Sequence, residues 1–297
     1  MNDILTIVIP TYNEKEYLLR KAVETVLNQT YPYIDLILIN DGSTDDTQII
    51  LEEYAKQDSR IQLFTRERHT KFRTIAECFN IGLQNAKGKW WHHDAADCWH
   101  EPTFAEDIMD FLNGRNDVIG AHSDFVVHEY DGRNRIIQTD KTWKSELSAF
   151  ENYLRFDHFG GMVFNMDICK QAGLWDVRFP RHQTREWTLR VLKFGNLVYV
   201  PKILWHFVYH EVDQKKNIAS IKYRFLANIK NNINFQWDML TASNVEAGRL
   251  AMMQAFQEFF QNPEWENERL VGEYADKLKA IKQLADEEAS EPWMGEK

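Results

Sequence analysis

The chain has 297 residues, with 45 Asp and Glu residues against 35 Lys and Arg residues, so its formal net charge at pH 7 is −10. An acidic balance of this size argues against a general nucleic-acid binder, which needs a basic face, and disfavours adsorption to an anionic membrane. Apolar residues make up 44% of the chain and charged residues 27%. That is the composition of an ordinary globular protein, long enough to bury a substantial core.

The cysteine pattern and the terminal sequence bear on the compartment. Cys78, Cys98 and Cys169 are widely spaced and form no Cys-x-x-Cys pair. A sparse, odd set of this kind is typical of reduced thiols in a cytosol-like compartment. The first residues lack the pattern of a signal peptide, and no apolar run approaches the roughly 20 residues of a membrane span. We therefore expect a cytoplasmic protein with no membrane span and no nucleic-acid partner.

Apolar runs in the first hundred residues stop abruptly at small and polar residues, and a helical pattern follows each of the first three. Strands are expected at 7–9, 36–39, 61–63 and 90–93, and helices at 14–28, 46–57 and 73–86. Because strands that alternate with helices form right-handed crossovers, the pattern predicts an α/β fold with a mainly parallel central sheet flanked by helices.

The rest of the chain is less regular. Further elements are expected as a strand at 118–127, a turn at Asp131-Gly132 with a return through 135–137, a strand at 160–164, a helix at 184–194 and a strand at 197–200 stopped by Pro201. Beyond about residue 220 no strand pattern persists, and the composition is helical and increasingly acidic. We expect residues 221–297 to form a helical C-terminal extension.

Polar residues follow the first two strands directly. Thr11 and Asn13 follow one strand, and Asp41 and Ser43 follow the next. Parallel sheets bind ligands just beyond the carboxyl ends of their strands, so these residues lie where a nucleotide would bind. Tyr12 can pack on a base ring, and Asp41 can accept a hydrogen bond from a base N–H group. The alternative is that these residues only form turns and caps, with Asn13 capping the first helix.

Five short segments occur in a fixed order along the first hundred residues. They are Pro10-Thr11-Tyr12-Asn13-Glu14, Asn28-Gln29-Thr30-Tyr31-Pro32, Asn40-Asp41-Gly42-Ser43-Thr44-Asp45, Asn80-Ile81-Gly82-Leu83 and Ala86-Lys87-Gly88-Lys89-Trp90. Together they resemble the start of the family 2 glycosyltransferases, strongly over residues 5–102 and more weakly over 158–205. The resemblance implies a GT-A fold, a nucleotide-diphosphate sugar donor, usually a divalent metal, and inversion at the anomeric carbon.

The resemblance is absent from the tail, so we expect the chain to divide into a transferase domain and an extension. Residues 1–220 would form the GT-A domain, with a nucleotide-binding half at 1–102 and an acceptor half at 103–220, and residues 221–297 would be the helical extension. The implied donor is a UDP-sugar, and the acceptor is an unknown glycan, lipid-linked compound or small molecule. By similarity to the family, Thr11, Tyr12 and Asp41 would bind the nucleotide base, with Pro10 contributing through the loop backbone and Glu14 through the start of the helix.

Residues for the diphosphate and the metal depart from the family pattern. Arg73 lies in a polar loop before a helix and is a candidate for the diphosphate. The family places an Asp-x-Asp sequence seven residues after a glycine that corresponds to Gly88. In this chain that count reaches Ala95, so Asp97 is the metal candidate for Mn²⁺ or Mg²⁺. Asp94 stands one residue early and is a weaker candidate for contact with the nucleotide.

The catalytic base is also displaced. The family's Glu-Asp pair at the head of a helix falls here on Gln183-Thr184, neither of which can act as a base. Glu186 is the nearest carboxylate, and His182 lies just before, so both are candidates for the base that deprotonates the acceptor hydroxyl. Glu186 can equally be an acidic residue that stabilises the start of its helix.

Two competing functions remain open from the sequence. The missing acid at Ala95 and the missing pair at Gln183-Thr184 fit a non-catalytic descendant that binds a nucleotide or nucleotide sugar. A zinc hydrolase would use His92, His93 and Asp97. Adjacent histidines on a strand point to opposite faces, however, so His92 and His93 are not expected to bind one ion, and His100 is expected to be a packing residue as well.

Overall fold

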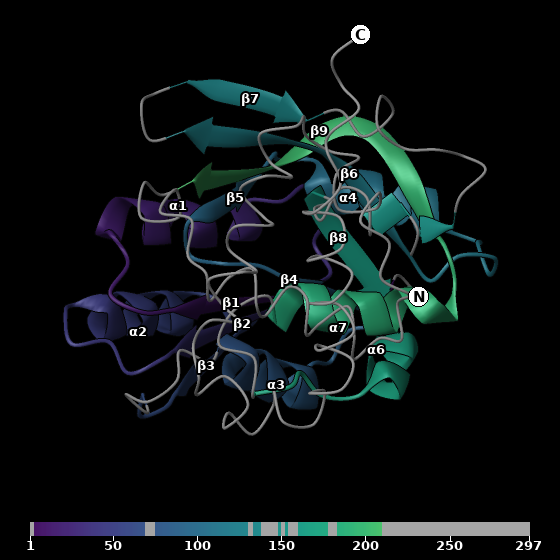
Figure 1. The fold of residues 1–297 in the computed structure, drawn as a ribbon. Helices are drawn as coiled ribbons and strands as arrows, with labels where there is room; N and C mark the ends of the chain where they lie inside the picture. The colour runs from purple at the N-terminus through teal and green to yellow at the C-terminus, as the bar shows by residue number, and fades with distance from the viewer. Residues whose placement is uncertain are drawn as a thin grey trace, which may run out of the picture.

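A computed structural model describes residues 3–68, 75–129, 133–137, 148–149, 152–153, 160–177 and 183–209 of the chain. The expected extension at 221–297 and the expected turn at Asp131-Gly132 lie outside these residues. The described part is an α/β fold built on one nine-stranded sheet, in the order β3-β2-β1-β4-β8-β6-β9-β5, with β7 paired to β6 (Figure 1).

Four parallel strands and three helices form the first half, as expected. The strands are β1 (Leu5–Thr11), β2 (Ile34–Asn40), β3 (Ile61–Thr65) and β4 (Trp90–His93), and the helices are α1 (Glu16–Leu27), α2 (Thr47–Gln57) and α3 (Ile75–Asn85). In the parallel register of β1 and β2, Thr11 pairs with Asn40. The two strands therefore end at the same level of the sheet, and their loops begin side by side.

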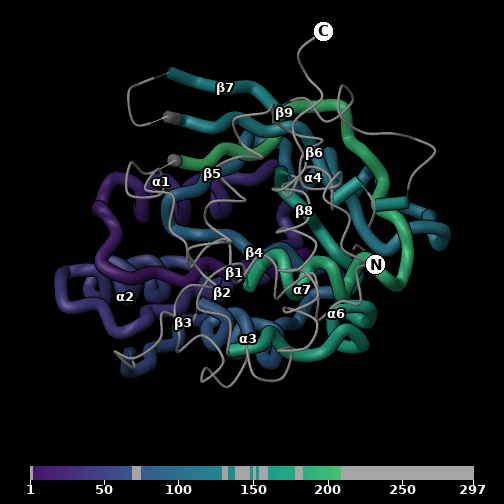
Figure 2. Tube along the Cα trace, in the orientation of Figure 1, coloured from purple at the N-terminus to yellow at the C-terminus, as the bar shows by residue number. Residues whose placement is uncertain are grey.

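The second half adds mostly antiparallel strands to this core. Its elements are β5 (Cys98–His100), α4 (Phe104–Leu112), β6 (Gly120–Glu129), β7 (Asn134–Ile137), β8 (Gly160–Asn165), α6 (Met166–Ala172), α7 (Gln183–Val191), a 3-10 turn at Leu192–Phe194 and β9 (Leu197–Tyr209). The strand β8 is antiparallel to both β4 and β6, and only β6 and β9 are parallel in this half. The tube in Figure 2 shows β9 running in a long arc across the molecule.

The expected end of the last strand at Pro201 is wrong. The strand β9 continues through Pro201 to Tyr209. Its register against β6 shifts at this point, from Val200 opposite Ser123 to Ile203 opposite Asp124. The irregularity accommodates a residue that has no N–H to donate, because proline within a sheet is tolerated at bulges. The continuation carries Trp205 and His206 to the strand β5.

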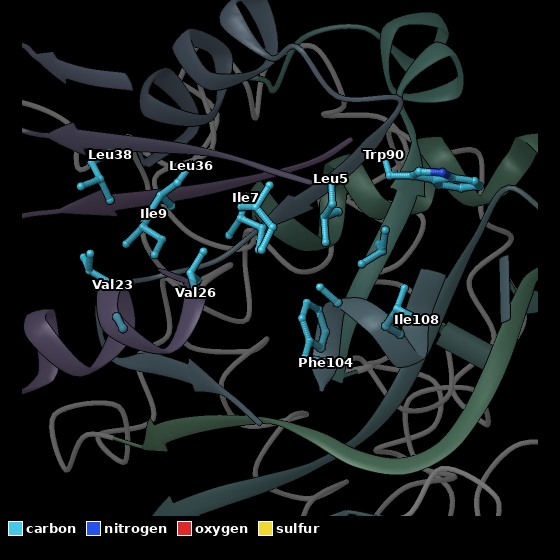
Figure 3. Packing of buried hydrophobic residues seen from close by; sticks show 14 of the residues in the cluster. Leu5, Ile7, Ile9, Val23, Val26, Leu36, Leu38, Trp90, Phe104 and Ile108 are labelled. Atoms are coloured by element: carbon cyan, nitrogen blue, oxygen red, sulfur yellow. The ribbon is translucent and has the colours of Figure 1, made fainter. Parts of the chain in front are cut away.

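The sheet is buried on both faces. On one face, alternate residues of β1 and β2, such as Ile7 and Leu36, pack on residues of α1 and α4, such as Val23 and Phe104 (Figure 3). On the other face, Val8 and Trp91 pack with residues of α3, α6 and α7. Parallel strands covered on both faces read as continuous apolar runs, which is why the first two strands are recognisable in the sequence.

Several family-like segments have structural roles away from the strand-end loops. The Gln29 side chain donates to the carbonyls of Thr25 and Glu101 at 2.8 Å each and accepts from the Ala105 N–H at 2.8 Å, which ties the end of α1 to the start of α4. A Cβ atom at Gly88 would lie 2.6 Å from the carbonyl oxygen of Ile4. Only glycine permits this close approach of the two backbones.

Candidate nucleotide-binding site

The loops after β1 and β2 are bonded to each other. The Asp41 N–H donates to the Thr11 carbonyl at 2.9 Å, and the Asn13 N–H donates to Ser43 Oγ at 3.1 Å. The Asn13 side chain donates to Thr44 Oγ1 at 3.2 Å and accepts from the Thr44 N–H at 2.8 Å. The two loops therefore form one connected polar surface at the carboxyl ends of the strands.

The expected capping role of Asn13 is wrong. The helix α1 begins at Glu16, and the residue before it, Lys15, makes no side-chain capping hydrogen bond. Asn13 instead has a φ of 46°, in the left-handed region that asparagine adopts more readily than most residues. The Asn13 amide holds the loop that follows β2 through Thr44, about thirty positions away. The capping pattern considers only neighbouring residues and therefore does not reveal this partner.

Tyr12 and Asp41, the two residues best suited to bind a base, are linked through Arg68. The guanidinium of Arg68 lies over the Tyr12 ring, 3.4 Å from its centroid, and its Nη1 is 3.0 Å from Asp41 Oδ2. Tyr12 is 41% exposed, whereas Asp41 is buried. A flat cation therefore lies over an exposed aromatic ring at this site, beside a carboxylate.

Arg66 completes this cluster. Its Nη1 donates to Asp41 Oδ1 at 2.6 Å, and its Nη2 forms an ion pair with Glu77 at the start of α3. Neither Arg66 nor Arg68 was identified from the sequence. The available signal was their position just after β3, because the ends of neighbouring parallel strands meet at one edge of the sheet.

The other residues expected at the base occupy the same loop. Pro10 and Thr11 are buried at the end of β1, and Pro10 lies beyond the last β1–β4 pair, which joins Val8 to His93. Its missing N–H thus costs no ladder bond. The Thr11 hydroxyl is buried and makes no hydrogen bond within the described residues. The half-buried Glu14 accepts from the Lys15 N–H at 2.9 Å, next to the start of α1.

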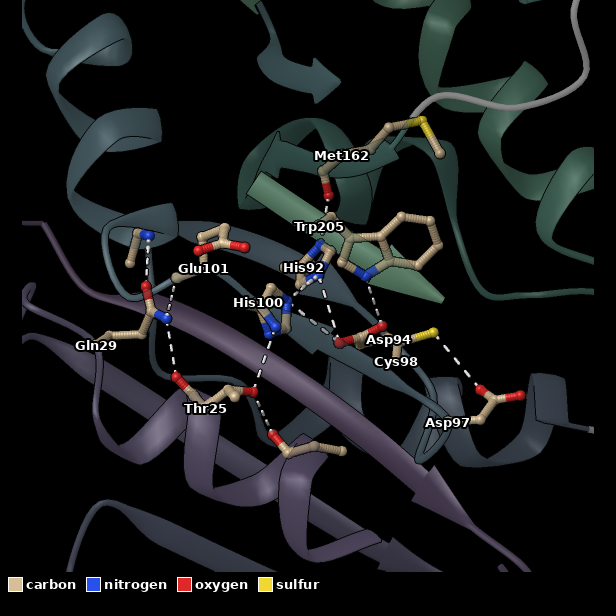
Figure 4. A network of polar contacts seen from close by, with 12 residues as sticks. Thr25, Gln29, His92, Asp94, Asp97, Cys98, His100, Glu101, Met162 and Trp205 are labelled. Atoms are coloured by element: carbon tan, nitrogen blue, oxygen red, sulfur yellow. Dashed lines mark hydrogen bonds and ion pairs between the residues drawn. The ribbon is translucent and has the colours of Figure 1, made fainter. Parts of the chain in front are cut away.

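Three buried polar side chains lie close together beneath the loop after β4. His92 Nε2 is 3.1 Å from His100 Nε2, and Asp94 Oδ2 is 3.2 Å from His100 Nε2 and 3.9 Å from His92 Nε2 (Figure 4). The other Asp94 oxygen accepts from Trp205 Nε1 at 3.1 Å, and His92 Nδ1 bonds the Met162 carbonyl at 2.7 Å. The Asp94 side chain has 0% exposed area, so it faces this cluster and not the solvent.

Burial sets the protonation of these groups. Burial raises the pKa of Asp94 to about 7, although the hydrogen bond from Trp205 lowers it in part. It lowers the pKa of His92 to about 4 and holds the pKa of His100 well below its usual range. Both imidazoles are therefore neutral at pH 7, because a charged form in this enclosed place would lose its hydration.

His93 points away from this cluster, as expected for adjacent strand residues. Its ring lies among aromatic rings on the other face, with centroids 5.0 Å from Trp175, 5.4 Å from Phe79 and 5.6 Å from Trp187. His92 and His93 therefore do not meet at one ion. Among the described residues, the group with metal-ligand spacing is His92, Asp94 and His100, and the set proposed for a zinc hydrolase is not brought together.

Asp97 lies in the loop between β4 and β5 and is half-buried. Its Oδ1 accepts from the Cys98 thiol at 3.5 Å, and its backbone carbonyl accepts from the Val208 N–H at 3.2 Å. The end of β9 thus fixes the backbone of this loop.

Glu186 is buried in the first turn of α7. Its two carboxylate oxygens accept from Arg190 at 2.8 and 2.9 Å, and Arg190 also donates to the carbonyls of Ala172 and Leu174. The pair joins α7 to the segment after α6. His182 and Arg73, the other two candidates from the sequence, lie outside the described residues.

The α/β fold and the polar loops at the ends of its parallel strands are those of a GT-A-type glycosyltransferase. A comparison with family models identifies the family. The model described as "Glycosyl transferase family 2" matches residues 6–173, which is more than half of the chain. The chain belongs to glycosyl transferase family 2.

Two curated relatives agree with this assignment. An uncharacterized glycosyltransferase of Haemophilus influenzae is 27% identical over 217 residues, covering 70% of this chain and 66% of the relative. A putative glycosyltransferase of Bacillus subtilis, EpsH, is 30% identical over 206 residues, covering 69% of this chain and 55% of the relative. The chain thus spans less than two thirds of each relative's length.

The similarity to solved structures concerns the fold. The crystal structure of S. aureus TarS 1–349 superposes with a TM-score of 0.61 at 15% identity, covering 95% of this chain and 77% of that one. The same protein in complex with UDP gives a TM-score of 0.59 at 14% identity, covering 94% and 77%. Within the part of the chain that the structure describes, no helix is long and apolar enough to cross a membrane.

Proposed function

We propose that this protein transfers a sugar from a nucleotide-diphosphate donor, with UDP as the nucleotide, to an acceptor hydroxyl. The observation that carries the proposal is the Tyr12–Arg68–Asp41 cluster on the connected loops after β1 and β2. Support comes from the membership of glycosyl transferase family 2 and from TarS, a protein of similar fold that was solved with UDP and with UDP-GlcNAc. The acceptor is a glycan, a lipid-linked compound or a small molecule.

In this proposal a uracil ring takes the place of the Arg68 guanidinium on Tyr12. Uracil and guanidinium are both flat groups that stack on an aromatic face. The centroid of the Tyr12 ring lies 3.4 Å from the guanidinium carbon of Arg68. Asp41 then accepts from the N3–H of uracil. Pro10, Thr11 and Glu14 shape the loop around the base. The displaced Arg68 stays next to the nucleotide and can turn to the negatively charged diphosphate.

Asp97 is our proposed ligand for Mn²⁺ or Mg²⁺. These ions take oxygen ligands and bind through one or two protein carboxylates together with substrate phosphates, so a single half-buried carboxylate fits such an ion once a diphosphate is present. When bound, the ion would neutralise charge on the leaving diphosphate. We propose Arg73 as a further contact to the diphosphate. Asp94, the weaker candidate for contact with the nucleotide, has a fully buried side chain, so we propose that it acts on the donor site through the loop that carries Asp97.

The acceptor hydroxyl needs a base, and we propose Glu186 or His182. Inversion requires the acceptor oxygen to attack the anomeric carbon from the face opposite the diphosphate. Glu186 is bonded to Arg190 through both oxygens and is buried, so it accepts a proton only if the acceptor reaches that pair. We propose residues 1–220 as the catalytic domain, with the base site in 1–102 and the acceptor side in 103–220, and 221–297 as its helical extension.

The test is incubation with a panel of UDP- and GDP-sugars in the presence of Mn²⁺, followed by measurement of the released nucleoside diphosphate. We expect release from a UDP-sugar in wild type, and a loss of release and of Mn²⁺ response in Asp97→Asn. Full activity and an unchanged Mn²⁺ response in Asp97→Asn would overturn the metal assignment. Tight UDP binding without hydrolysis or transfer would instead favour a non-catalytic, nucleotide-binding descendant of the family.

A further inference from the structure

The buried group of His92, Asp94 and His100 has the geometry of a metal site that the proposed transferase activity does not use. The three facing atoms, His92 Nε2, His100 Nε2 and Asp94 Oδ2, are separated by 3.1, 3.2 and 3.9 Å. The point in the plane of these three atoms that is equidistant from them lies about 2.0 Å from each, which is the bond length of Zn²⁺ to imidazole nitrogen and carboxylate oxygen, and a closer approach of Asp94 to His92 would give the tetrahedral arrangement. All three residues are buried.

The hydrogen bond at His92 Nδ1 leaves the Nε2 atom available as a metal ligand. The Met162 carbonyl, 2.7 Å from Nδ1, can only accept, so Nδ1 carries the proton and Nε2 carries a lone pair (Figure 4). Histidines that bind metals characteristically donate their other ring N–H to a carbonyl or carboxylate in this way. Asp94 is oriented similarly, because Trp205 Nε1 holds one oxygen and turns the other toward the two imidazoles.

Hydrogen bonds among the three side chains alone leave some of these buried atoms without a good partner. Asp94 Oδ2 is fully buried and meets no donor at hydrogen-bond geometry, although His100 Nε2 is 3.2 Å away and the Ala95 N–H and the Cys98 thiol also act on this carboxylate. Two Nε2 atoms face each other at 3.1 Å, and at most one proton can lie between them. Buried polar atoms without partners are costly, and one cation would satisfy all three.

We propose that His92, Asp94 and His100 bind one Zn²⁺ ion. Two imidazoles and one carboxylate suit zinc, whereas Mg²⁺ and Mn²⁺ prefer sites composed of oxygen atoms. The three protein ligands are buried near β4, β5 and β9, so the ion would stabilise the fold, with a water molecule in the fourth position of its tetrahedron. It joins the two strands that flank the loop of Asp97 and makes that loop rigid.

The zinc site is separate from the proposed donor-metal site, and the two are tested separately. Protein without a histidine tag is stripped with a chelator and titrated with Co²⁺, whose visible absorption reports tetrahedral imidazole and carboxylate ligation, and Zn²⁺ is then added in competition. We expect one Co²⁺ per chain, displaced by Zn²⁺, and a rise in Tm with Zn²⁺. Asp97→Asn should leave the spectrum, the stoichiometry and the Tm shift unchanged.

Matched leucine variants identify the ligands. His100→Leu should weaken Zn²⁺ binding by more than about 100-fold, because even the loss of a residue that only orients a ligand costs about 10- to 100-fold. His122→Leu replaces another fully buried histidine on β6 and should keep the Co²⁺ spectrum. If His100→Leu does not fold, Asp94→Asn, which keeps the shape of the side chain, takes its place.

Three results would overturn the proposal. The first is a wild-type protein that binds neither Co²⁺ nor Zn²⁺ at micromolar concentration. The second is a weak spectrum typical of six-coordinate Co²⁺. The third is a loss of binding in Asp97→Asn or His122→Leu equal to that in His100→Leu or Asp94→Asn. These measurements need no donor sugar, so they test the zinc site even if the protein shows no transfer activity.

Discussion

Replacing Asp41 with asparagine should weaken UDP binding in a way that the structure allows us to estimate. The side chain of Asp41 is 8% exposed, and its two oxygens face Arg66 at 2.6 Å and Arg68 at 3.0 Å. A carboxylate offers about four lone-pair positions. Asp41 can therefore accept a hydrogen bond from the N3–H of uracil while it keeps its bond to Arg66.

The expected loss follows from the charge on Asp41. A hydrogen bond to a charged group contributes about 1.5–3 kcal/mol, which corresponds to about a 10- to 150-fold change in Kd. The asparagine amide also carries N–H donors, which can meet the acceptor N3 of cytosine, so the preference for UDP over CDP should narrow. The lost ion pairs should lower the unfolding free energy by about 1–3 kcal/mol as well.

Isothermal titration with UDP, CDP and GDP in the presence of Mn²⁺ measures this effect, with Tm as the check on folding. The matched control is Asp58→Asn. Asp58 also bonds an arginine, Arg60, at 2.7 Å, but it precedes β3 and lies at the other end of the strands. The control should keep wild-type affinity. If Asp41→Asn binds UDP within twofold of wild type, Asp41 does not contact the base. If GDP binds more tightly than UDP, the assignment of the base is wrong.

Three further predictions concern the framework around the site. Gly88→Ala should lower the unfolding free energy by about 1–3 kcal/mol or more in denaturant titrations, since its Cβ would lie 2.6 Å from the Ile4 carbonyl, and a neutral effect would contradict that contact. Burial lowers the pKa of His122 to about 3, so the unfolded chain takes up a proton below about pH 6.5 that the folded protein does not. His122 should therefore lower the unfolding free energy by about 1.4 kcal/mol for each unit that the pH decreases. His122→Phe should remove this contribution between about pH 6 and 4, and a variant with the same pH dependence as wild type would refute the prediction. Glu186→Gln should lower the unfolding free energy by about 1–3 kcal/mol through its weakened bond to Arg190, and wild-type stability would contradict a structural role.

The part of the fold that follows from local pattern was predictable. The strands β1 and β2 are buried on both faces, so their apolar runs stand out, and their pairing of Thr11 with Asn40 is what brings Tyr12 and Asp41 together. The role of Asn13 was not predictable in this way. A capping pattern is local, whereas its true partner, Thr44, depends on how two loops meet.

The remainder depends on contacts between distant segments. The orientation of Asp94 is set by Trp205, which is 111 positions away and lies on a strand that the proline at 201 was expected to end. The approach of His92 to His100 requires the return of the chain through β5, a three-residue strand too short to give a clear pattern. The position of Arg68 depends on the path of the chain after β3, beyond any helix or strand periodicity.

A crystal structure of the protein with UDP and Mn²⁺ tests the proposed nucleotide site most directly. We expect the uracil ring on Tyr12 in place of the Arg68 guanidinium, its N3–H bonded to Asp41, and Mn²⁺ between Asp97 and the diphosphate. UDP bound away from the loops after β1 and β2, or bound there with Arg68 still stacked on Tyr12, would contradict it.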